Sequence, residues 1–563
     1  MSRVFGNTIG LKSNQIRRIE HIYRRKIPPQ KIVTPEVARL LIDLSNEIRR
    51  QIGILVGRRG SIEMVMVGDQ RGITIPDLSR YRAGVPRLRG LRLIHTHLQG
   101  EPLTEEDLTD LALLRLDMMV ALLTDGKGDQ EPVHSAHLLP DNPEKKVWEV
   151  APLSSVRQMD IDFLKWIQSL EDEFQKGQRA LSTRGSREKA ILLSVSREKR
   201  EALENSMEEL RDLTESSGVQ IAETIIQRPQ NISQSTLIGE GKLKELLVKC
   251  MQLGVDLIIF DQNLTPGQMA SISDLTELRV IDRTQLILDI FAQRAHTRDG
   301  KTQVELAQLK YLLPRLARKT LALSRLTGGI GGRGPGETKL EIDRRRARER
   351  IHLLEKELEK LSRRREQRRA LRKRAGVPIL SIIGYTNAGK STLFNLLTKS
   401  QFNMEDKLFA TLDTATRRLR LTNSLLKKGG EDLVITDTVG FIKDLPKDLM
   451  GAFRPTFDEL RESDLLIHLV DVSSPRREDH IEAVDKILLE LGLEDVPRFL
   501  VLNKEDKLDQ EEVRALCKRY GAVSISALRP ETLEDFFKGL EKKLLEIGLL
   551  AKEPGVDRAF SDL

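Results

Sequence analysis

The sequence predicts an α/β multidomain protein: an N-terminal α/β extension, a second α/β domain with a helical hairpin, and a third α/β domain with a mixed, mostly parallel sheet. Three observations support this prediction. The chain has 563 residues, enough for three or four domains of ~150 residues. Short apolar runs alternate with segments of helical periodicity, as in strand–helix units. Two leucine-patterned helical segments flank a glycine-rich break.

The first predicted unit covers residues 1–150. A helix is expected over 104–116, because Thr104 precedes the helical pattern and Asp107 follows three residues later, as in a capping box. Residues 151–190 are polar and predict a linker with one helix. The apolar runs that predict strands in this unit include Ile52–Val56, Met64–Val67 and Leu91–Ile94.

The remaining segments follow the same logic. Residues 191–300 alternate strands with helices, which predicts a parallel sheet. Residues 301–375 predict an antiparallel hairpin, because leucines repeat at helical spacing on both sides of the glycine-rich loop at 327–336. Residues 376–546 form the third α/β unit, and residues 547–563 are a short polar tail.

The composition fits a folded protein of a reducing compartment. Lys and Arg outnumber Asp and Glu by 92 to 84, a basic excess that permits a polyanionic partner such as RNA. Two isolated cysteines, Cys250 and Cys517, make neither a disulfide framework nor a metal cluster. No signal peptide and no apolar stretch of about 18 residues is evident. We expect a cytoplasmic protein without a membrane span, and a monomer.

The third unit carries a glycine loop between an apolar strand, Ile379–Ile383, and a helix. Such glycines let backbone N–H groups close around a phosphate, while a lysine reaches the β- and γ-phosphate oxygens and a hydroxyl binds Mg²⁺. This predicts a nucleotide-binding P-loop. The loop consists of Gly384, Tyr385, Thr386, Asn387, Ala388, Gly389, Lys390 and Ser391, and Thr392 continues into the helix.

Another apolar strand ends at Asp437, followed by Thr438, Val439 and Gly440. An Asp at this place holds Mg²⁺ through water, and the Gly440 amide can face the γ-phosphate. Between the P-loop and Asp437, a switch segment should supply a second hydroxyl for Mg²⁺. We expect Thr411 in this role, with Thr414 as the alternative, although both can be ordinary turn hydroxyls. The switch segment consists of Phe409, Ala410, Thr411, Leu412 and Asp413.

The strand Arg498–Leu502 leads into a segment that selects the base. A carboxylate at Asp506 can accept from both N1–H and the 2-amino group of guanine, a donor pair that adenine lacks. Asn503 would hold the loop and touch N7, and Lys504 would cover the ring. The order of these motifs predicts a guanine nucleotide, GTP or GDP. The expected base contacts are Asn503, Lys504, Glu505, Asp506, Ser526, Ala527 and Leu528.

These motifs resemble the HflX family of ribosome-associated GTPases. Beyond the GTP motifs, the resemblance rests on Gly239–Lys242, Asp261–Pro266, Arg279–Thr284 and Gly328–Arg346, and it covers about 190–546. It implies a P-loop GTPase domain preceded by an α/β domain with a helical hairpin. It also implies binding to the large ribosomal subunit and the splitting or rescue of stalled ribosomes.

Two positions in the GTPase domain bear on its activity. Phe441 follows Gly440, where many GTPases place a water-positioning Gln, so we expect slow hydrolysis that the ribosome stimulates. Asn387 stands where potassium-dependent relatives hold a monovalent cation, so it either binds K⁺ or only shapes the loop.

The hairpin is the predicted RNA contact. Arginines cluster after the glycine loop and again over 363–374, and such clusters neutralise phosphates. The alternative is a solvated coiled-coil face, because acids such as Glu355 and Glu359 are interleaved. The expected contacts with ribosomal RNA are Arg333, Arg344, Arg345 and Arg346.

The N-terminal extension carries His95 and His97 at the end of an apolar strand, so both imidazoles point to one face. With Asp107 they leave an open fourth position, the pattern of a catalytic Zn²⁺. The spacing resembles the JAMM/MPN metalloprotease fold, but Arg50 or Gln51 stands where that fold has its general-base Glu. Three alternatives follow: a metal-free strand with two surface histidines, a degenerate or structural metal site, and an active hydrolase.

Three functions remain open at this point. The protein splits or rescues ribosomes, or it assists subunit assembly without splitting, or it is bifunctional through an N-terminal metal-binding or protein-binding module.

Overall fold

A computed structural model of the chain describes residues 3–78, 81, 87–124, 132–140, 142–159, 161–183, 188–276, 278–316, 335–374, 377–398, 415–421, 431–437, 440–441, 457 and 460–550. These residues form two compact units. The first contains residues 1–204, 219–260 and 271–280, and the second contains 205–218, 261–270 and 281–563.

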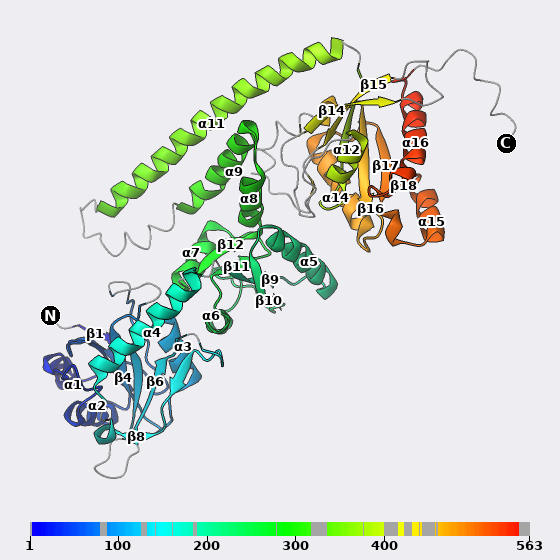
Figure 1. The fold of residues 1–563 in the computed structure, drawn as a ribbon. Helices are drawn as coiled ribbons and strands as arrows, with labels where there is room; N and C mark the ends of the chain where they lie inside the picture. The colour runs from blue at the N-terminus through cyan, green and yellow to red at the C-terminus, as the bar shows by residue number, and fades with distance from the viewer. Residues whose placement is uncertain are drawn as a thin grey trace, which may run out of the picture. The chain divides into compact units, whose positions relative to one another are not determined.

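The first unit begins with an eight-stranded mixed sheet of order β1-β3-β2-β4-β5-β6-β7, in which β8 also pairs with β6 (Figure 1). Strands β4 and β5 run parallel, whereas β2 is antiparallel to both of its neighbours. The strands are β1 (Val4–Gly6), β2 (Ile52–Gly57), β3 (Ile62–Val67), β4 (Leu91–His97), β5 (Met118–Leu123), β6 (Pro132–Leu138), β7 (Trp148–Val150) and β8 (Ser154–Ser155).

Four helices accompany this sheet: α1 (Ser13–Glu20), α2 (Pro35–Ile48), α3 (Glu105–Leu113) and α4 (Phe163–Thr183). Helix α3 starts where the capping-box pattern predicts, with Thr104 as the N-cap. Helix α4 buries Phe163 and Ile167 completely in the core of the first sheet. The polar segment 151–190 is therefore more than a linker, because β8 and α4 pack with the N-terminal sheet.

The second sheet has four strands in the order β10-β9-β11-β12, and β9 is parallel to β10 and β11. The alternation of strands and helices agrees with the pattern in the sequence. The strands are β9 (Lys189–Val195), β10 (Gln220–Gln227), β11 (Leu257–Phe260) and β12 (Arg279–Asp282). The helices are α5 (Arg200–Ser216), α6 (Glu240–Leu253), α7 (Pro266–Leu275) and α8 (Arg283–Arg294).

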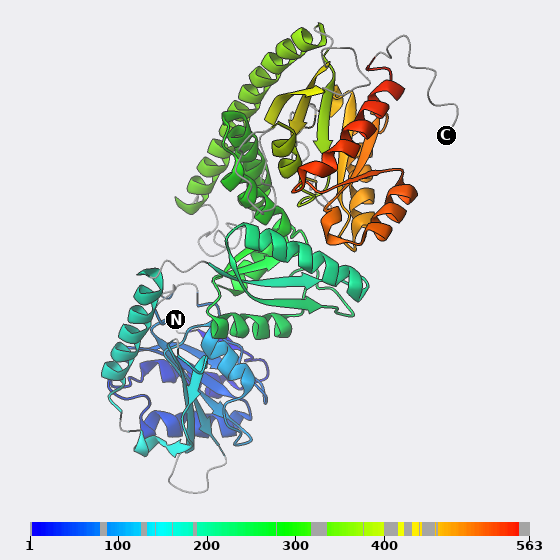
Figure 2. The ribbon, with the colours of Figure 1, turned by 45° about the vertical axis from the view of Figure 1, so that its right-hand side comes forward.

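The helical hairpin consists of α9 (Arg298–Leu316) and α11 (Pro335–Arg374), which lie side by side (Figures 1 and 2). Leu306 packs with Leu354 and Leu358 along the predicted leucine seam. The ion pairs Arg298–Glu357 and Glu305–Arg350 show that the two helices run antiparallel, as the sequence predicts.

The last sheet has six strands in the order β14-β15-β13-β16-β17-β18. Only the β14–β15 pairing is antiparallel among these neighbours, so the prediction of a mixed, mostly parallel sheet is confirmed. The strands are β13 (Ile379–Ile383), β14 (Ala415–Leu421), β15 (Glu431–Asp437), β16 (Leu465–Asp471), β17 (Arg498–Asn503) and β18 (Val523–Ile525). The helices are α12 (Lys390–Thr398), α14 (Arg477–Leu491), α15 (Gln510–Tyr520) and α16 (Leu533–Glu546).

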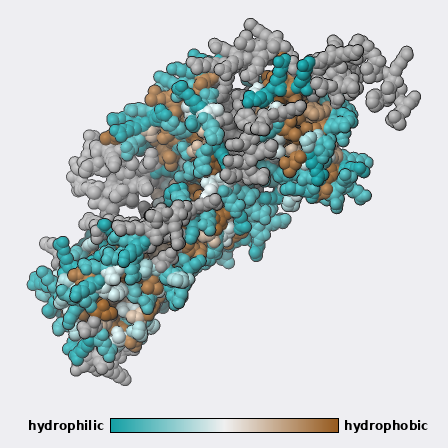
Figure 3. Space-filling model, in the orientation of Figure 1, coloured by the Kyte–Doolittle hydropathy of each residue, from teal (hydrophilic) through white to brown (hydrophobic). Residues whose placement is uncertain are grey.

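Hydrophilic side chains dominate the coloured face in Figure 3, and hydrophobic ones appear in scattered patches. Within the described ranges, no helix combines the length and the apolar character needed to cross a bilayer.

Candidate nucleotide-binding site

The loop between β13 and α12 has a backbone that only glycine fits at two places. At Gly384, φ is +151° and a Cβ would lie 2.2 Å from the carbonyl oxygen of Leu469. At Gly389, φ is +94° and a Cβ would lie 2.3 Å from Nδ2 of Asn503. The glycines thus let the loop approach β16 and β17 closely, as a loop that wraps a phosphate requires.

Lys390 starts α12 and lies 7% exposed beneath this loop. Its ammonium donates to the carbonyl of Tyr385 at 2.7 Å. Burial lowers the pKa of Lys390 to about 8, against the opposing effect of the Asp437 carboxylate. A Cβ at Gly440 would lie 3.0 Å from Nζ of Lys390, so this amide-bearing position borders the ammonium. A bound phosphate oxygen would stabilise the positive charge of Lys390, which burial disfavours.

The oxygen groups near the loop suit Mg²⁺. Ser391 stands in the first turn of α12, and buried Asp437 pairs with Ile382 at the end of β15. Hydroxyl and carboxylate oxygens are the ligands that Mg²⁺ prefers. Thr392 lies in the same helix. The predicted switch residues Phe409, Ala410, Thr411, Leu412 and Asp413, the alternative Thr414, and Thr438 and Val439 lie outside the described residues.

The predicted base-selecting residues gather at the ends of β17 and β18. Asn503 is buried, and its amide donates to the carbonyl of Ala388 at 2.8 Å and accepts from the backbone N–H of Ala527 at 2.9 Å. One side chain therefore joins the P-loop to the loop after β18.

The acid of this segment is ready to accept hydrogen bonds. The hydroxyl of Ser526 holds the pKa of the Asp506 carboxyl below its usual value, so the group is ionised at neutral pH. Lys504 has a positive φ of 67° and pairs with Asp471 at 2.6 Å. Glu505 opens a short 3-10 turn, and Leu528 is 74% exposed.

Phe441 is buried at 1% exposure and stacks on Phe457. Its N–H donates to the carbonyl of Gly384, and its carbonyl accepts from Thr386 N–H. The aromatic ring cannot orient a water by hydrogen bonding, so this position holds the P-loop through its backbone instead.

A contact that the motifs did not reveal lies on the outer side of the P-loop. The Tyr385 hydroxyl donates to the Glu209 carboxylate of α5 at 2.5 Å. The Tyr385 ring stacks on His480 of α14, with ring centroids 4.1 Å apart. These residues help to line a pocket of about 240 Å³ beside the P-loop. The motif position of Tyr385 gave no signal for this contact, because Glu209 is 176 residues away in sequence.

Glu209 also belongs to a buried charge network. Arg283, at the start of α8, pairs with Glu209 at 2.5 Å and with Asp261 at 2.9 Å. Ser206 of α5 donates to Asp261 as well. Although burial opposes the charge, the two carboxylates raise the pKa of Arg283 above its ordinary value. The network ties α5 and α8 to the P-loop tyrosine within the second unit.

The other predicted residues lie elsewhere in the fold. Arg345 and Arg346 are exposed on α11 and Arg344 is half-buried, whereas Arg333 lies outside the described residues. His95, His97 and Asp107 converge in the first unit. Both histidines are buried, which contradicts the interpretation of a strand with two surface histidines. Asn387, by contrast, belongs to the P-loop itself and is exposed with φ +62°, a left-handed conformation that asparagine tolerates.

Comparison with known proteins agrees with this geometry. The family models that match are "GTP-binding GTPase N-terminal" over residues 204–292, "GTP-binding GTPase Middle Region" over 294–372 and "50S ribosome-binding GTPase" over 379–504. These matches cover most of the second α/β domain, most of the hairpin and most of the nucleotide domain.

Relatives named "GTPase HflX" give the family. The protein of Caldanaerobacter subterraneus is 45% identical over 323 residues, which are 57% of this chain and 74% of the relative. The protein of Alkalihalophilus pseudofirmus is 48% identical over 307 residues, 54% of this chain and 71% of the relative. The Escherichia coli protein is 44% identical over 327 residues, 58% of this chain and 75% of the relative. P-loop GTPases of this family generally use Mg²⁺. The chain is a GTP-hydrolysing enzyme and belongs to the HflX family of GTPases.

Proposed function

We propose that this GTPase binds the large ribosomal subunit through the hairpin and uses GTP to split or rescue stalled ribosomes. The observation that carries the proposal is the basic end of α11, where Arg345, Arg346 and Arg348 are exposed to solvent. Exposed guanidinium groups on a helix can reach RNA phosphates. The match to a family described as "50S ribosome-binding GTPase" favours ribosomal RNA as the partner.

The arginines of α11 do not all serve this purpose. Arg350 makes two hydrogen bonds of 2.7 Å to Glu305 of α9, and Arg363 pairs with Glu359 in its own helix. These two residues support the hairpin itself. Arg345 makes only a 3.7 Å pair with Glu349, which an RNA phosphate can replace at small cost because exposed ion pairs contribute little. The proposed RNA contact therefore consists of Arg344, Arg345 and Arg346, and Arg350 and Arg363 are left to the ion pairs of the hairpin.

Cosedimentation with ribosomes tests the contact. Changing Arg344, Arg345 and Arg346 to Glu should weaken binding and flatten its dependence on salt, because fewer counterions are released. A variant with Arg514, Lys518 and Arg519 changed to Glu is the matched control, because these exposed bases lie on α15 of the nucleotide domain. Equal cosedimentation of both variants and the unchanged protein would refute the contact.

Sedimentation of intact ribosomes with a non-hydrolysable GTP analogue separates splitting from assembly. Conversion of intact ribosomes to free subunits supports splitting. Comigration without conversion supports the alternative, an assembly GTPase that binds RNA without separating subunits.

The ribosome should also set the rate of hydrolysis. Buried Phe441 stands where a water-positioning Gln would act, so the free protein lacks that group at this position. We expect faster GTP turnover with large subunits than without them, and equal rates would contradict this.

A monovalent ion is proposed at the exposed Asn387, where a K⁺ would sit close to the phosphates. Hydrolysis rates in matched K⁺ and Na⁺ buffers test this role. Equal rates would mean that Asn387 only shapes the loop, through its positive φ.

A further inference from the structure

A side-chain cluster in the first unit takes no part in the nucleotide chemistry. His95 and His97 come from β4, and Asp107 comes from the first turn of α3. One potential ligand atom from each residue lies within 4.8 Å of the others. Among the described residues, no other group of three or more histidine, cysteine or acidic side chains lies this close together.

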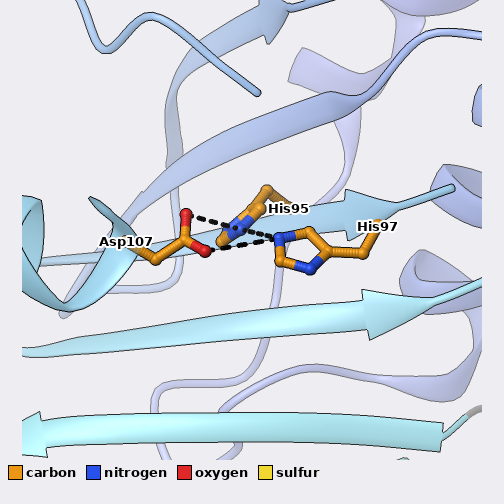
Figure 4. Close-up of side chains that lie close together, drawn as sticks. All are labelled: His95, His97 and Asp107. Atoms are coloured by element: carbon orange, nitrogen blue, oxygen red, sulfur yellow. Dashed lines mark hydrogen bonds and ion pairs between the residues drawn. The ribbon is translucent and has the colours of Figure 1, made fainter. Parts of the chain in front are cut away.

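The three side chains are directed toward one another (Figure 4). The Nε2 atoms of His95 and His97 lie 2.8 Å apart. The Asp107 carboxylate faces both rings, with Oδ1 3.4 Å from His95 Nε2 and Oδ2 3.6 Å from His97 Nε2. Two imidazole nitrogens and a carboxylate oxygen form a mixed N/O donor set, which transition metals of the zinc type prefer to Mg²⁺ or Ca²⁺.

The tautomer of His97 is fixed by its other nitrogen. Nδ1 lies 2.7 Å from the backbone carbonyl oxygen of Glu101, which only accepts, so Nδ1 carries the proton. The neutral imidazole then has its lone pair on Nε2, which faces His95 in the cluster. A backbone carbonyl behind a ligating histidine is the usual support for a metal-bound imidazole.

The side chain of Asp107 is held in place by Thr104. Oδ2 accepts from the Thr104 hydroxyl at 2.7 Å and from the Thr104 N–H at 2.8 Å. The capping box of α3 thus fixes the carboxylate that faces the imidazoles.

The three side chains differ in their exposure to solvent. In the sheet, His95 lies between Gly53 of β2 and Ala121 of β5, neither of which carries a large side chain. Ile73 covers Gly53 so closely that a Cβ there would lie 2.9 Å from its Cδ1. The side chain of Asp107 is 21% exposed, whereas those of His95 and His97 are 2% and 3% exposed. Entry is therefore from the side of Asp107.

We propose that His95 Nε2, His97 Nε2 and Asp107 form a binding site for a zinc-type divalent transition metal, with the fourth position open toward solvent. Without an ion, an N–H on one Nε2 must fill the 2.8 Å space between the two ring nitrogens. With an ion, both lone pairs and the carboxylate have a common partner. The site joins the end of β4 to the start of α3.

The cluster is assigned to metal binding and not to hydrolysis. Arg50 and Gln51 stand where a hydrolase of the resembled metalloprotease class has its basic Glu. The Arg50 guanidinium donates to the carbonyls of Asn7 and Ile9, and Gln51 is a buried amide. Neither group accepts a proton from water at neutral pH.

Cobalt binding to the full chain tests the proposal. The protein is stripped with a chelator, its nucleotide site is filled with GDP and excess Mg²⁺, and Co²⁺ is added. A four-coordinate Co²⁺ absorbs visible light much more strongly than the six-coordinate ion, so the spectrum reports the geometry. We expect about one Co²⁺ per chain with four-coordinate absorption, and its displacement by Zn²⁺.

Two ligand variants and a control complete the test. His97→Ala should abolish the cobalt spectrum, and the nearly isosteric Asp107→Asn should weaken affinity by more than the roughly 10- to 100-fold cost of losing an outer supporting group. His137→Gln, which removes a half-buried histidine of β6 in edge-to-face contact with Trp166, should bind like the unchanged protein. Circular dichroism and GDP binding verify that each variant is folded. The proposal is overturned if the unchanged protein binds no Co²⁺ or if folded Asp107→Asn binds with unchanged affinity.

Discussion

The P-loop and the histidine cluster are both strand–loop–helix segments, but they are built to hold opposite charges by different means. In the P-loop, β13 leads through two conformationally special glycines to α12, so backbone N–H groups and the helix N-terminus are available to an anion. In the cluster, β4 leads to α3, whose N-terminus is already occupied by Thr104 and Asp107. There, side chains supply the ligand atoms. The same local architecture therefore suits an anion when its backbone is free, and it suits the proposed cation when its backbone is capped.

The largest expected effect concerns base selection by the P-loop domain. Asp506→Asn should reduce affinity for GTP by about 1000-fold, because two hydrogen bonds to a charged acceptor, of roughly 2 kcal/mol each, are lost. Affinity for xanthosine triphosphate should rise, because an amide can donate to its 2-carbonyl. Equilibrium binding of both nucleotides measures the switch. Asp509→Asn, at the exposed N-cap of α15, is the control. Unchanged preference for GTP would remove Asp506 from the base site.

The second prediction tests whether capping and metal binding are joined in the cluster. Thr104→Ala removes a cap and a support of Asp107, so it should cost about 1 kcal/mol of stability and lower Zn²⁺ affinity by about 10- to 100-fold. Thr34→Ala is a matched control, because Thr34 caps α2 and its removal should cost a similar amount of stability. Zinc titration should separate the two variants. If they bind zinc equally well, the cap does not support the site.

The third prediction uses the charge held by the P-loop. Burial lowers the pKa of Lys390 to about 8, and bound phosphates should raise it again. Binding of GDP should therefore take up a proton above pH 8, and affinity should fall by up to about 10-fold per pH unit from there to the bound-state pKa. At pH 6.5, where Lys390 is already charged, no uptake by this group is expected. Calorimetry in two buffers of different ionisation enthalpy measures the proton count. A count near zero at pH 8.5 would show that Lys390 stays charged without nucleotide.

The smallest expected effect concerns the outer side of the P-loop. Tyr385→Phe and Glu209→Gln should each weaken GTP binding by about 5-fold, because a loop released from α5 must be ordered by the ligand. The double variant should lose little more than either single one, since both remove the same hydrogen bond. Tyr520→Phe is the control, because it removes a tyrosine–glutamate bond at the surface of α15. Additive losses would show that the two residues act separately.

The two segments also differ in how far they could be predicted from sequence. The P-loop was predictable because its function depends on glycines at fixed spacing, and Gly384 and Gly389 have the positive φ that makes that spacing necessary. The shared face of His95 and His97 followed from strand alternation, but their burial did not, since it depends on long-range neighbours such as Gly53 and Ile73. The predicted fold class is confirmed, as are the family and the GTPase activity.

The Glu209 contact shows why the remaining interactions could not be predicted. Tyr385 belongs to a motif whose spacing describes phosphate binding, and nothing in that spacing specifies the residue on its outer side. Glu209 is one of several acids of α5, and only the fold shows that it meets Tyr385 and Arg283. Burial of the pair selects it from the other acids, and burial of a charge depends on the assembled fold rather than on local sequence.

The two hydrogen bonds of Asn503 have a consequence for which ligands the protein binds. A single amide sets the separation between the P-loop and the loop after β18, because it bonds Ala388 on one side and Ala527 on the other. A ligand must therefore present a guanine and a β-phosphate at that spacing to contact both loops together. GMP has the guanine but no β-phosphate, and inorganic pyrophosphate has the phosphates but no guanine. Neither should therefore compete well with GDP, even when the two are supplied together.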